Sequence, residues 1–322
     1  MHNKYIIFGG SGFVGTHFAN LLDKKSLDFL ISDIVKPRKQ SWEFILSDVR
    51  KQISFNTSDD IGNIIINLAA IHKTPGHPDK DYFETNIKGA ENICNFASKN
   101  NINTIVFTSS IAVYGTYEDK KYENTLQMPD IPYGISKLSA EYIHKQWQSE
   151  DPLNRRLIIL RPGVVFGKYE NANFTRLINS LQGKYFAYVG RKDVKKACVY
   201  VKDLAQVIYE FSIDKSIKID TFNVSYNPSL SIEDIVSEVS EIGGMKFPRF
   251  VIPRWFIVFL SSIMYYIFKQ KDFNPQRMNK LVISNNIDSE KINNKVNFTF
   301  GFSKGIADWM AETEFINSKK IY

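Results

Sequence analysis

The start of the chain carries a glycine pattern that restricts the path of its backbone. An apolar run, Tyr5-Ile6-Ile7-Phe8, is followed at once by glycines at positions 9, 12 and 15. Gly9 would make a tight turn, Gly12 would let the peptide approach a ligand, and Gly15 would let the next helix pack closely on the strand. The free amides and positive dipole end of that helix favour an anion such as a pyrophosphate. The opening therefore predicts a dinucleotide-binding strand, loop and helix.

An acidic residue after the second apolar run bears on which dinucleotide is bound. Glycine-rich turns also join strands to helices for structural reasons, so the loop alone does not establish a cofactor. Asp33 follows Phe29-Leu30-Ile31, eighteen positions after Gly15. A carboxylate there can accept hydrogen bonds from the adenosine ribose hydroxyls and repels a 2′-phosphate, which favours NAD over NADP. Lys36 and Arg38 leave NADP open, because basic side chains there could hold a phosphate.

The composition excludes several classes of protein. The 322 residues are 43% hydrophobic and 23% charged, with a net charge of +7. The basic residues are dispersed rather than interleaved with aromatics in a block, which disfavours nucleic-acid binding, while a mildly basic chain suits a phosphate-bearing substrate. Cys94 and Cys198 have neither metal-ligand spacing nor a disulfide framework, and no signal-peptide pattern is visible. We therefore expect no metal and a cytoplasmic location.

One apolar segment has to be compared with a membrane span. Residues 255–268 carry no charged side chain and are flanked by Arg249, Arg254, Lys269 and Lys271. The segment is shorter than the ~20 residues that a spanning helix needs. We therefore expect no transmembrane span and favour a buried helix of a C-terminal lobe. The alternative is an interfacial helix that makes peripheral membrane contact.

Short apolar runs alternate with helix-like segments in the first half of the chain. This alternation is typical of βαβ units, and the continuous apolar character of the runs is typical of strands buried on both faces of a parallel sheet. Ligands of such sheets bind at the carboxyl ends of the strands. A last strand over 222–224 and a helix with Ser231 as its N-cap are also expected. The runs lie at residues 4–8, 28–32, 43–46, 63–68, 104–108 and 156–161.

A tyrosine and a lysine share one face of a predicted helix. The helix begins at Pro132, and a spacing of four places Tyr133 and Lys137 one above the other. Tyrosine is a poor base at neutral pH, but a neighbouring ammonium and an oxidised nicotinamide ring would lower its pKa by stabilising the phenolate. Ser110, after the fifth strand, could hydrogen-bond the same substrate oxygen. We predict that Ser110, Tyr133 and Lys137 are catalytic.

Together with the glycine loop and Asp33, this set resembles the extended short-chain dehydrogenase/reductases, in particular the nucleotide-sugar epimerase/dehydratase branch. The resemblance covers nearly the whole chain. It implies an α/β fold, with a Rossmann-type doubly wound parallel sheet and a smaller, mostly helical C-terminal substrate lobe. It implies an NAD-binding domain over 1–168, with 200–225 returning to it, and a substrate-binding lobe over 169–199 and 226–322.

The same resemblance implies the contacts of cofactor and substrate. Asn86 would brace the active-site backbone. Asn173 and Lys196 match positions that contact a diphosphate; the family has an Arg where Lys196 stands, so the charge is kept without the bidentate geometry, and Arg191 is the candidate to compensate. Ser110 would also contact the substrate. The implied NAD-binding positions are Gly9, Gly12, Phe13, Val14, Gly15, Asp33, Asp48, Val49, Leu68, Ala69, Ala70, Tyr133, Lys137 and Pro162.

One departure from the family pattern narrows the reaction. Dehydratases of this branch carry an Asp-Glu pair after the active-site hydroxyl, whereas this chain has Ile111-Ala112, which cannot transfer protons. We predict an NAD-dependent nucleoside-diphosphate-sugar 4-epimerase or related oxidoreductase, which transiently oxidises a sugar hydroxyl in the synthesis of surface polysaccharide precursors. The alternatives are an NAD(P)H-dependent keto-sugar reductase and a steroid- or lipid-alcohol dehydrogenase. The resemblance also implies a homodimer through the helices around 86–98 and 134–148.

Overall fold

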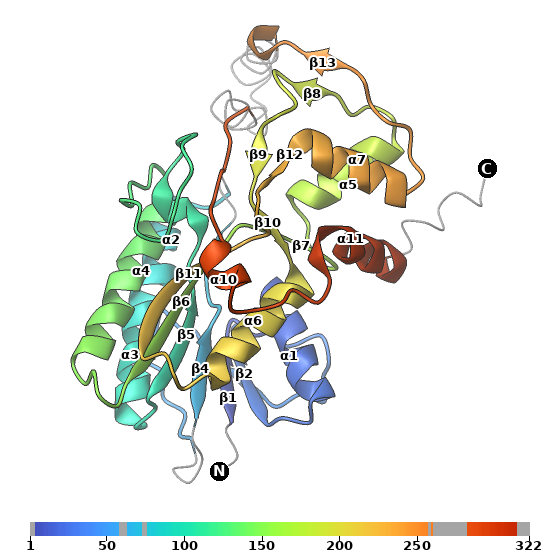
Figure 1. The fold of residues 1–322 in the computed structure, drawn as a ribbon. Coiled ribbons are helices and arrows are strands. Elements are labelled where there is room, and N and C mark those ends of the chain that lie inside the picture. The colour runs from blue at the N-terminus through green and yellow to red at the C-terminus, as the bar shows by residue number, and fades with distance from the viewer. Residues whose placement is uncertain (1–3, 58–62, 73–75, 257–258, 260–281, 314–322) are drawn as a thin grey trace.

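The central element of the protein is a parallel β-sheet. The computed structural model describes residues 4–57, 63–72, 76–256, 259 and 282–313. Among these, seven strands form one sheet in the order β11-β6-β5-β4-β1-β2-β3 (Figure 1), and every pairing in it is parallel. This confirms the predicted α/β doubly wound fold. The strands are β1 (Tyr5–Phe8), β2 (Phe29–Asp33), β3 (Phe44–Leu46), β4 (Ile64–Asn67), β5 (Thr104–Thr108), β6 (Arg156–Pro162) and β11 (Ile219–Val224).

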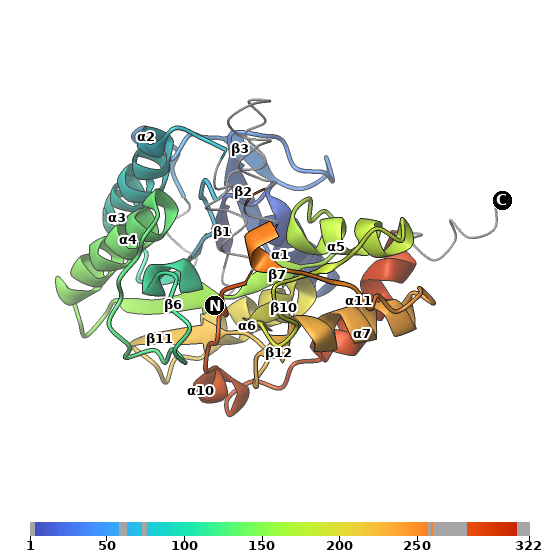
Figure 2. The same cartoon turned by 90° about the horizontal axis from the view of Figure 1, so that it is seen from above.

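Helices cover both faces of this sheet (Figure 2). On one face lie α1 (Phe13–Lys24) and α6 (Val201–Ile213). On the other lie α3 (Gly89–Lys99) and α4 (Pro132–Ser149). A short helix, α2 (Asp79–Tyr82), and a π-helical turn, η1 (Phe83–Lys88), lead into α3, and a 3₁₀ turn, η2 (Ile111–Tyr114), follows β5.

The two helix layers explain why most positions of the strands are apolar. In β1, Tyr5 and Ile7 pack in the core beneath α1 and α6. Ile6 and Phe8 point the other way, into the core beneath α3 and α4. Since successive side chains of a strand alternate between faces, a sheet that is covered on both sides needs apolar residues throughout.

A smaller body lies at the carboxyl ends of the large sheet's strands (Figure 1). Its described helices are α5 (Asn173–Gln182), α7 (Ile232–Ile242) and α11 (Gly301–Glu312), whereas α10 (Glu290–Asn293) packs against β11 of the large sheet. Ser231 caps α7 in a capping box with Asp234, which confirms the predicted N-cap. The described residues of this body also pair as β7 (Val164–Phe166) with β10 (Cys198–Tyr200), β9 (Lys195–Lys196) with β12 (Leu230–Ser231), and β8 (Tyr188–Val189) with β13 (Val251–Ile252).

The boundary between a cofactor domain and a substrate lobe stays a proposal. We place the cofactor domain at 1–168 with 200–225, and the lobe at 169–199 and 226–322. The position of α6 against α1 and of β11 beside β6 supports the return of 200–225 to the large sheet.

The apolar segment 255–268 lies largely outside the described residues. Of it, Trp255, Phe256 and Phe259 are described, and their side chains are exposed. For these three residues the predicted burial is wrong, because they follow β13 beyond the core of the smaller body. No helix within the described ranges is long and apolar enough to cross a membrane.

Candidate active site

In the glycine loop between β1 and α1, Gly9 and Gly15 are tightly packed, whereas Gly12 is more open. A Cβ on Gly9, whose φ is +75°, would lie 2.6 Å from the Ala69 nitrogen, and one on Gly15 would lie 2.5 Å from the Gly10 Cα. A Cβ on Gly12 would meet only the Gly9 oxygen, at 3.2 Å. Gly9 and Gly15 are therefore required by packing, whereas Gly12 leaves room for a ligand to approach the peptide. This cradle fits a pyrophosphate at the N-terminus of α1.

Asp33 is tied directly to this loop. Its Oδ2 accepts a hydrogen bond of 3.0 Å from the Ser11 amide, and its Oδ1 accepts bonds of 2.7 Å from Ile34 and 3.2 Å from Val35. Burial raises the pKa of the carboxyl, while these amide bonds oppose the rise. The carboxylate is thus fixed at the tip of β2, where an adenosine ribose would lie.

The other predicted cofactor positions lie around the same edge. Leu68, Ala69 and Ala70 directly follow β4, and Pro162 ends β6. Val49 is buried, and its carbonyl accepts a 2.8 Å bond from Asn92.

Two basic side chains near the predicted adenosine position, Arg50 and Arg38, already contact other side chains. The Arg50 guanidinium binds both carboxylate oxygens of Asp48, at 2.9 Å and 2.7 Å, and this hydrogen bonding lowers the Asp48 pKa. Arg38 lies over the Tyr169 ring at 4.0 Å, which favours its role as a stacking group over that of a phosphate ligand.

The three predicted catalytic residues lie close together at the ends of β5 and α4. The Ser110 hydroxyl lies close enough to the Tyr133 phenol for hydrogen bonding to lower the pKa of the phenol, and it accepts a 3.1 Å bond from the Ala112 amide. Lys137 is 2% exposed, and its Nζ donates a 2.7 Å bond to the Thr108 carbonyl. The structure thus places the serine hydroxyl against the phenol and anchors the lysine to the end of β5.

Burial dominates the electrostatics of this cluster in the chain alone. Burial raises the pKa of Tyr133 to about 12, and the Ser110 hydrogen bond only partly offsets the rise. Burial also lowers the pKa of Lys137 to about 7, so its charge is incomplete at neutral pH. The expectation that Lys137 and a bound nicotinamide ring together lower the Tyr133 pKa stays a prediction; in the chain alone the lysine bonds to Thr108 and is itself desolvated.

Asn86 braces the start of α4, as the resemblance implied. It lies in the π-helical turn, a feature common at functional sites. Its Oδ1 accepts a 3.1 Å bond from the Ile71 amide, and its Nδ2 donates a 2.8 Å bond to Ser136 Oγ. Ser136 in turn donates to the Tyr133 carbonyl at 2.9 Å. The backbone of Tyr133 is thereby tied to the segment that follows β4.

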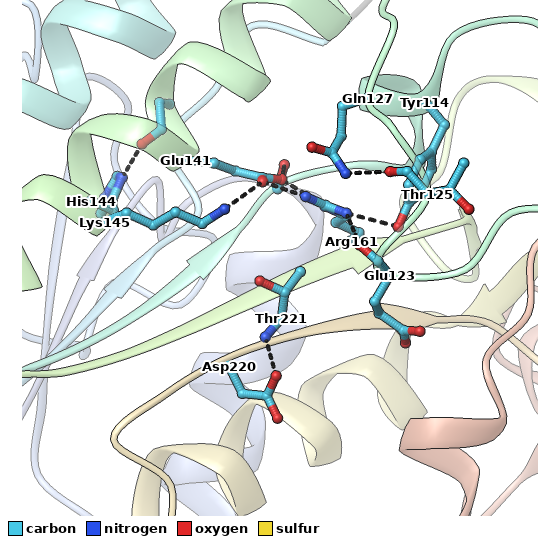
Figure 3. A network of polar contacts seen from close by, with 12 residues as sticks. Tyr114, Glu123, Thr125, Gln127, Glu141, His144, Lys145, Arg161, Asp220 and Thr221 are labelled. Atoms are coloured by element: carbon cyan, nitrogen blue, oxygen red, sulfur yellow. Dashed lines mark hydrogen bonds and ion pairs between the residues drawn. The ribbon is translucent and has the colours of Figure 1, made fainter.

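A buried ionic network is built around Glu141, Arg161 and Tyr114 (Figure 3). Arg161 of β6 donates two hydrogen bonds to Glu141 of α4, at 2.8 Å and 2.6 Å, and both residues are at most 1% exposed. Ser109 donates to the Glu141 carboxylate at 2.6 Å. Arg161 also donates to the Tyr114 hydroxyl at 2.8 Å, which donates to Asn223 at 2.7 Å. The network therefore connects α4 with the ends of β5, β6 and β11.

Sequence reasoning missed this network. The available signal was the position of Glu141, four residues after Lys137, which places it on the helix face that faces the sheet. Arg161 lies one residue before the end of β6, directly after the apolar residues 157–160.

The predicted substrate residues are spread over the smaller body. Asn173 begins α5 and is exposed. Arg191 Nη2 pairs with Glu118 at 2.5 Å and bonds Ser284 at 3.1 Å. Lys196 Nζ donates a 2.8 Å bond to the Ile283 carbonyl, and burial, reinforced by the Arg191 charge, lowers its pKa to about 8. Arg191 and Lys196 thus lie near enough to repel each other, and a bound anion would relieve that repulsion.

The family of the chain follows from comparison with known proteins. The sequence model of the NAD dependent epimerase/dehydratase family matches residues 5–224, from β1 to β11. The chain belongs to this family. The cofactor of this family member is NAD, in agreement with the glycine cradle and with Asp33.

Relatives of this family member carry the names of sugar 4-epimerases. N-acetyl-alpha-D-glucosaminyl-diphospho-ditrans,octacis-undecaprenol 4-epimerase of Escherichia coli O157:H7 is 28% identical, over 99% of this chain and 98% of its own. A bifunctional UDP-glucose 4-epimerase and UDP-xylose 4-epimerase of Arabidopsis thaliana is 23% identical, over 79% of this chain and 85% of its own. The structure of UDP-N-acetylglucosamine 4-epimerase from Bacillus cereus matches with a TM-score of 0.75 and 20% identity, over 97% of this chain and 99% of its own, and shows the shared fold.

The glycine cradle makes a prediction about Gly12. In G12A the fold should persist, because the new Cβ meets one oxygen at 3.2 Å, but NAD affinity should fall at least about tenfold as the methyl group occupies the open face. G15A is the comparison: its Cβ would lie 2.5 Å from backbone, so it should lower the melting temperature as well. Calorimetric titration with NAD and thermal unfolding measure both effects. Unchanged NAD affinity in G12A would contradict the cradle.

The ionic network makes a second prediction. R161M leaves the Glu141 carboxylate buried without its partner and should lower the free energy of unfolding by about 3–5 kcal/mol. The double variant E141L/R161M should regain most of that loss, because no charge is left unpaired. K39M, which breaks the exposed pair with Asp23, should cost at most about 1 kcal/mol. Urea unfolding measures all three. A loss in R161M no larger than in K39M would show that the buried pair does not couple α4 to β6.

Proposed function

We propose that the chain is a 4-epimerase of sugars carried on a diphosphate, which acts by transient oxidation of the sugar hydroxyl. The observation that carries the proposal is the proximity of Ser110 to Tyr133 at the sheet edge that also holds the glycine cradle. The 4-epimerase names of its relatives support the position of the oxidised carbon.

Tyr133 and Ser110 have different roles in the proposed proton transfer. NAD, when bound, supplies a reversible hydride acceptor and a positive charge beside the phenol. Tyr133 Oη takes the proton of the sugar hydroxyl and later returns it, while Ser110 Oγ holds the same oxygen in line. Asn86 and Ser136 fix the backbone of Tyr133 during these steps.

The residues after Ser110 limit the reaction to this oxidation and reduction. Ile111 and Ala112 have no group that can protonate or deprotonate a neighbouring carbon. The keto-sugar can therefore turn over and be reduced on its other face, but it has no partner for elimination of water. This supports epimerisation over dehydration.

We propose that Arg191 and Lys196, with Asn173, bind the diphosphate of the substrate. Their charges support this role, since two neighbouring basic groups favour an anion. A nucleoside diphosphate is the first candidate for the carrier. A polyprenyl diphosphate is the second, favoured by the undecaprenol-linked substrate in the name of the Escherichia coli relative, which matches 99% of this chain. Either substrate suits the synthesis of surface polysaccharide precursors.

We further propose a cytoplasmic location, supported by the free and buried thiols of Cys94 and Cys198. The sequence alternative of peripheral membrane contact through 255–268 keeps support from its three described residues, which are exposed.

We also propose a homodimer, with α3 and α4 of each copy packed together. The exposed apolar side chains of Ile135 and Tyr142 on α4 support this interface. Light scattering should give twice the chain mass of 37.1 kDa. A mass of one chain at micromolar concentration would contradict it.

The function makes a prediction about Tyr133. Y133F should lower kcat for 4-epimerisation by about 10²–10⁴-fold, because the proton acceptor is lost, while the NAD released on heat denaturation stays at the wild-type amount. Y142F, a change of the same kind on the exposed side of α4, should keep full activity. The assay offers UDP-, dTDP- and GDP-sugars to the purified protein.

Two outcomes would overturn the proposal. Full activity in Y133F would remove the phenol from the mechanism. Net consumption of added NAD(P)H with a keto-sugar would instead support the reductase alternative, because an epimerase causes no net redox change.

A further inference from the structure

One end of the smaller body carries a surface that neither the core nor the proposed chemistry uses. It is formed by residues 184–190 and 246–256, together with Phe259, and we call it the β8–β13 tip. The two segments are joined by backbone hydrogen bonds from Tyr188 to Phe250 at 2.9 Å and from Gly190 to Ile252 at 2.8 Å. Figure 1 shows this pair at the end of the molecule beyond the carboxyl ends of the large sheet's strands.

The tip exposes large aromatic side chains. Tyr188 of β8 is 1% exposed and faces the core, but Phe250 is 80% exposed and Trp255 is 71% exposed. Such a concentration on one end of a protein marks an interaction site. The remaining exposed aromatic side chains of the tip are Tyr185, Phe247, Phe256 and Phe259.

The aromatic residues are interleaved with basic ones. Lys184, Lys246, Arg249 and Arg254 are exposed, and the sequences 184–190 and 246–259 contain no Asp or Glu. Two copies docked through this surface would oppose like charges across a symmetric contact, which is unfavourable. The tip therefore fits a partner that is apolar inside and negatively charged at its surface.

We propose that the β8–β13 tip docks on an anionic lipid bilayer. Tryptophan, tyrosine and phenylalanine partition into the boundary between headgroups and acyl chains, and basic side chains add attraction to anionic headgroups. The mixture of exposed aromatic and basic side chains at the tip provides both contributions.

The tip lies next to the proposed diphosphate residues. Arg191 is the second residue after β8, and its amide donates a 2.8 Å bond to the Val189 carbonyl. Arg254 of the tip lies beside Gly190, so the docked surface continues toward Arg191. This deepens the proposed function and rests on it: docking would present the site to a sugar diphosphate whose polyprenyl chain stays in the bilayer.

The test is co-flotation of the full-length protein with vesicles. With phosphatidylglycerol/phosphatidylcholine vesicles the wild type should float, less at high salt, and with pure phosphatidylcholine it should bind much less. K246Q/R249Q should lower the partition coefficient about 30-fold, since each basic residue near an anionic surface contributes about fivefold. F250S/W255S should lower it at least about tenfold.

The matched control is L153S/K215Q, which removes an exposed apolar and an exposed basic side chain at the amino end of the large sheet. It should float like the wild type. The proposal is overturned if the wild type does not bind vesicles, or if both tip variants bind them as well as the wild type does. It is also overturned by a fall in the light-scattering mass of F250S/W255S without any vesicle binding, which would make the tip an interface between copies.

The same variants separate this proposal from the function beneath it. With a water-soluble UDP-sugar, the tip variants should keep wild-type epimerisation and NAD content. Tip-dependent flotation without epimerisation of any sugar diphosphate would overturn the proposed function and leave the docking surface in place. Epimerisation without flotation would overturn the docking surface and leave the proposed function in place.

Discussion

The ion pair between Glu141 and Arg161 is the interaction on which the rest of the site depends. Two charges are buried almost completely, and this is tolerated because a two-pronged contact and further hydrogen bonds from Ser109 and to Tyr114 satisfy them. The pair holds α4 against β5 and β6. Because Tyr133 lies in the first turn of that same helix, and Ser110 follows Ser109, the pair helps to hold the phenol near the serine hydroxyl.

The cofactor end and the substrate end of the molecule are built in different ways. At the cofactor end, backbone geometry does most of the work: Gly9 and Gly15 are forced by packing, and Asp33 is fixed by three amides. At the proposed substrate end, two basic side chains are held by a carboxylate and a carbonyl that a diphosphate would have to replace or supplement. The first arrangement is rigid, and the second depends on side-chain charge.

The parts of the fold that follow from backbone periodicity could be predicted from the sequence. Most positions in the strands of the large sheet are apolar because helices cover both faces, so β1 and β6 are evident as apolar runs. The strands of the smaller body have only two or three residues each, as in β9 and β13 with two, and so they show no period to detect. The segment after β13 shows the limit of composition, because its apolar residues suit a core and a lipid surface equally well.

The sequence predicts which residues form the candidate site, but it does not predict their protonation or their ion-pair partners. The spacing of Tyr133 and Lys137 indicates one helix face, yet it does not reveal that Lys137 bonds to Thr108 and loses charge through burial. Glutamate is usually exposed on a helix, and only the contact of Glu141 with Arg161 shows that it is buried as an ion-pair partner. Desolvation and pairing arise from tertiary contacts, which a local pattern does not contain.

The central claim is that one carbon of the sugar is oxidised and reduced again without leaving the site. The most direct test uses a sugar diphosphate labelled with deuterium at C4. The account predicts that the inverted product keeps the deuterium, because the hydride leaves and returns within one closed site. Replacement of the label by solvent hydrogen would contradict the account, since inversion would then proceed by loss and return of a proton at carbon.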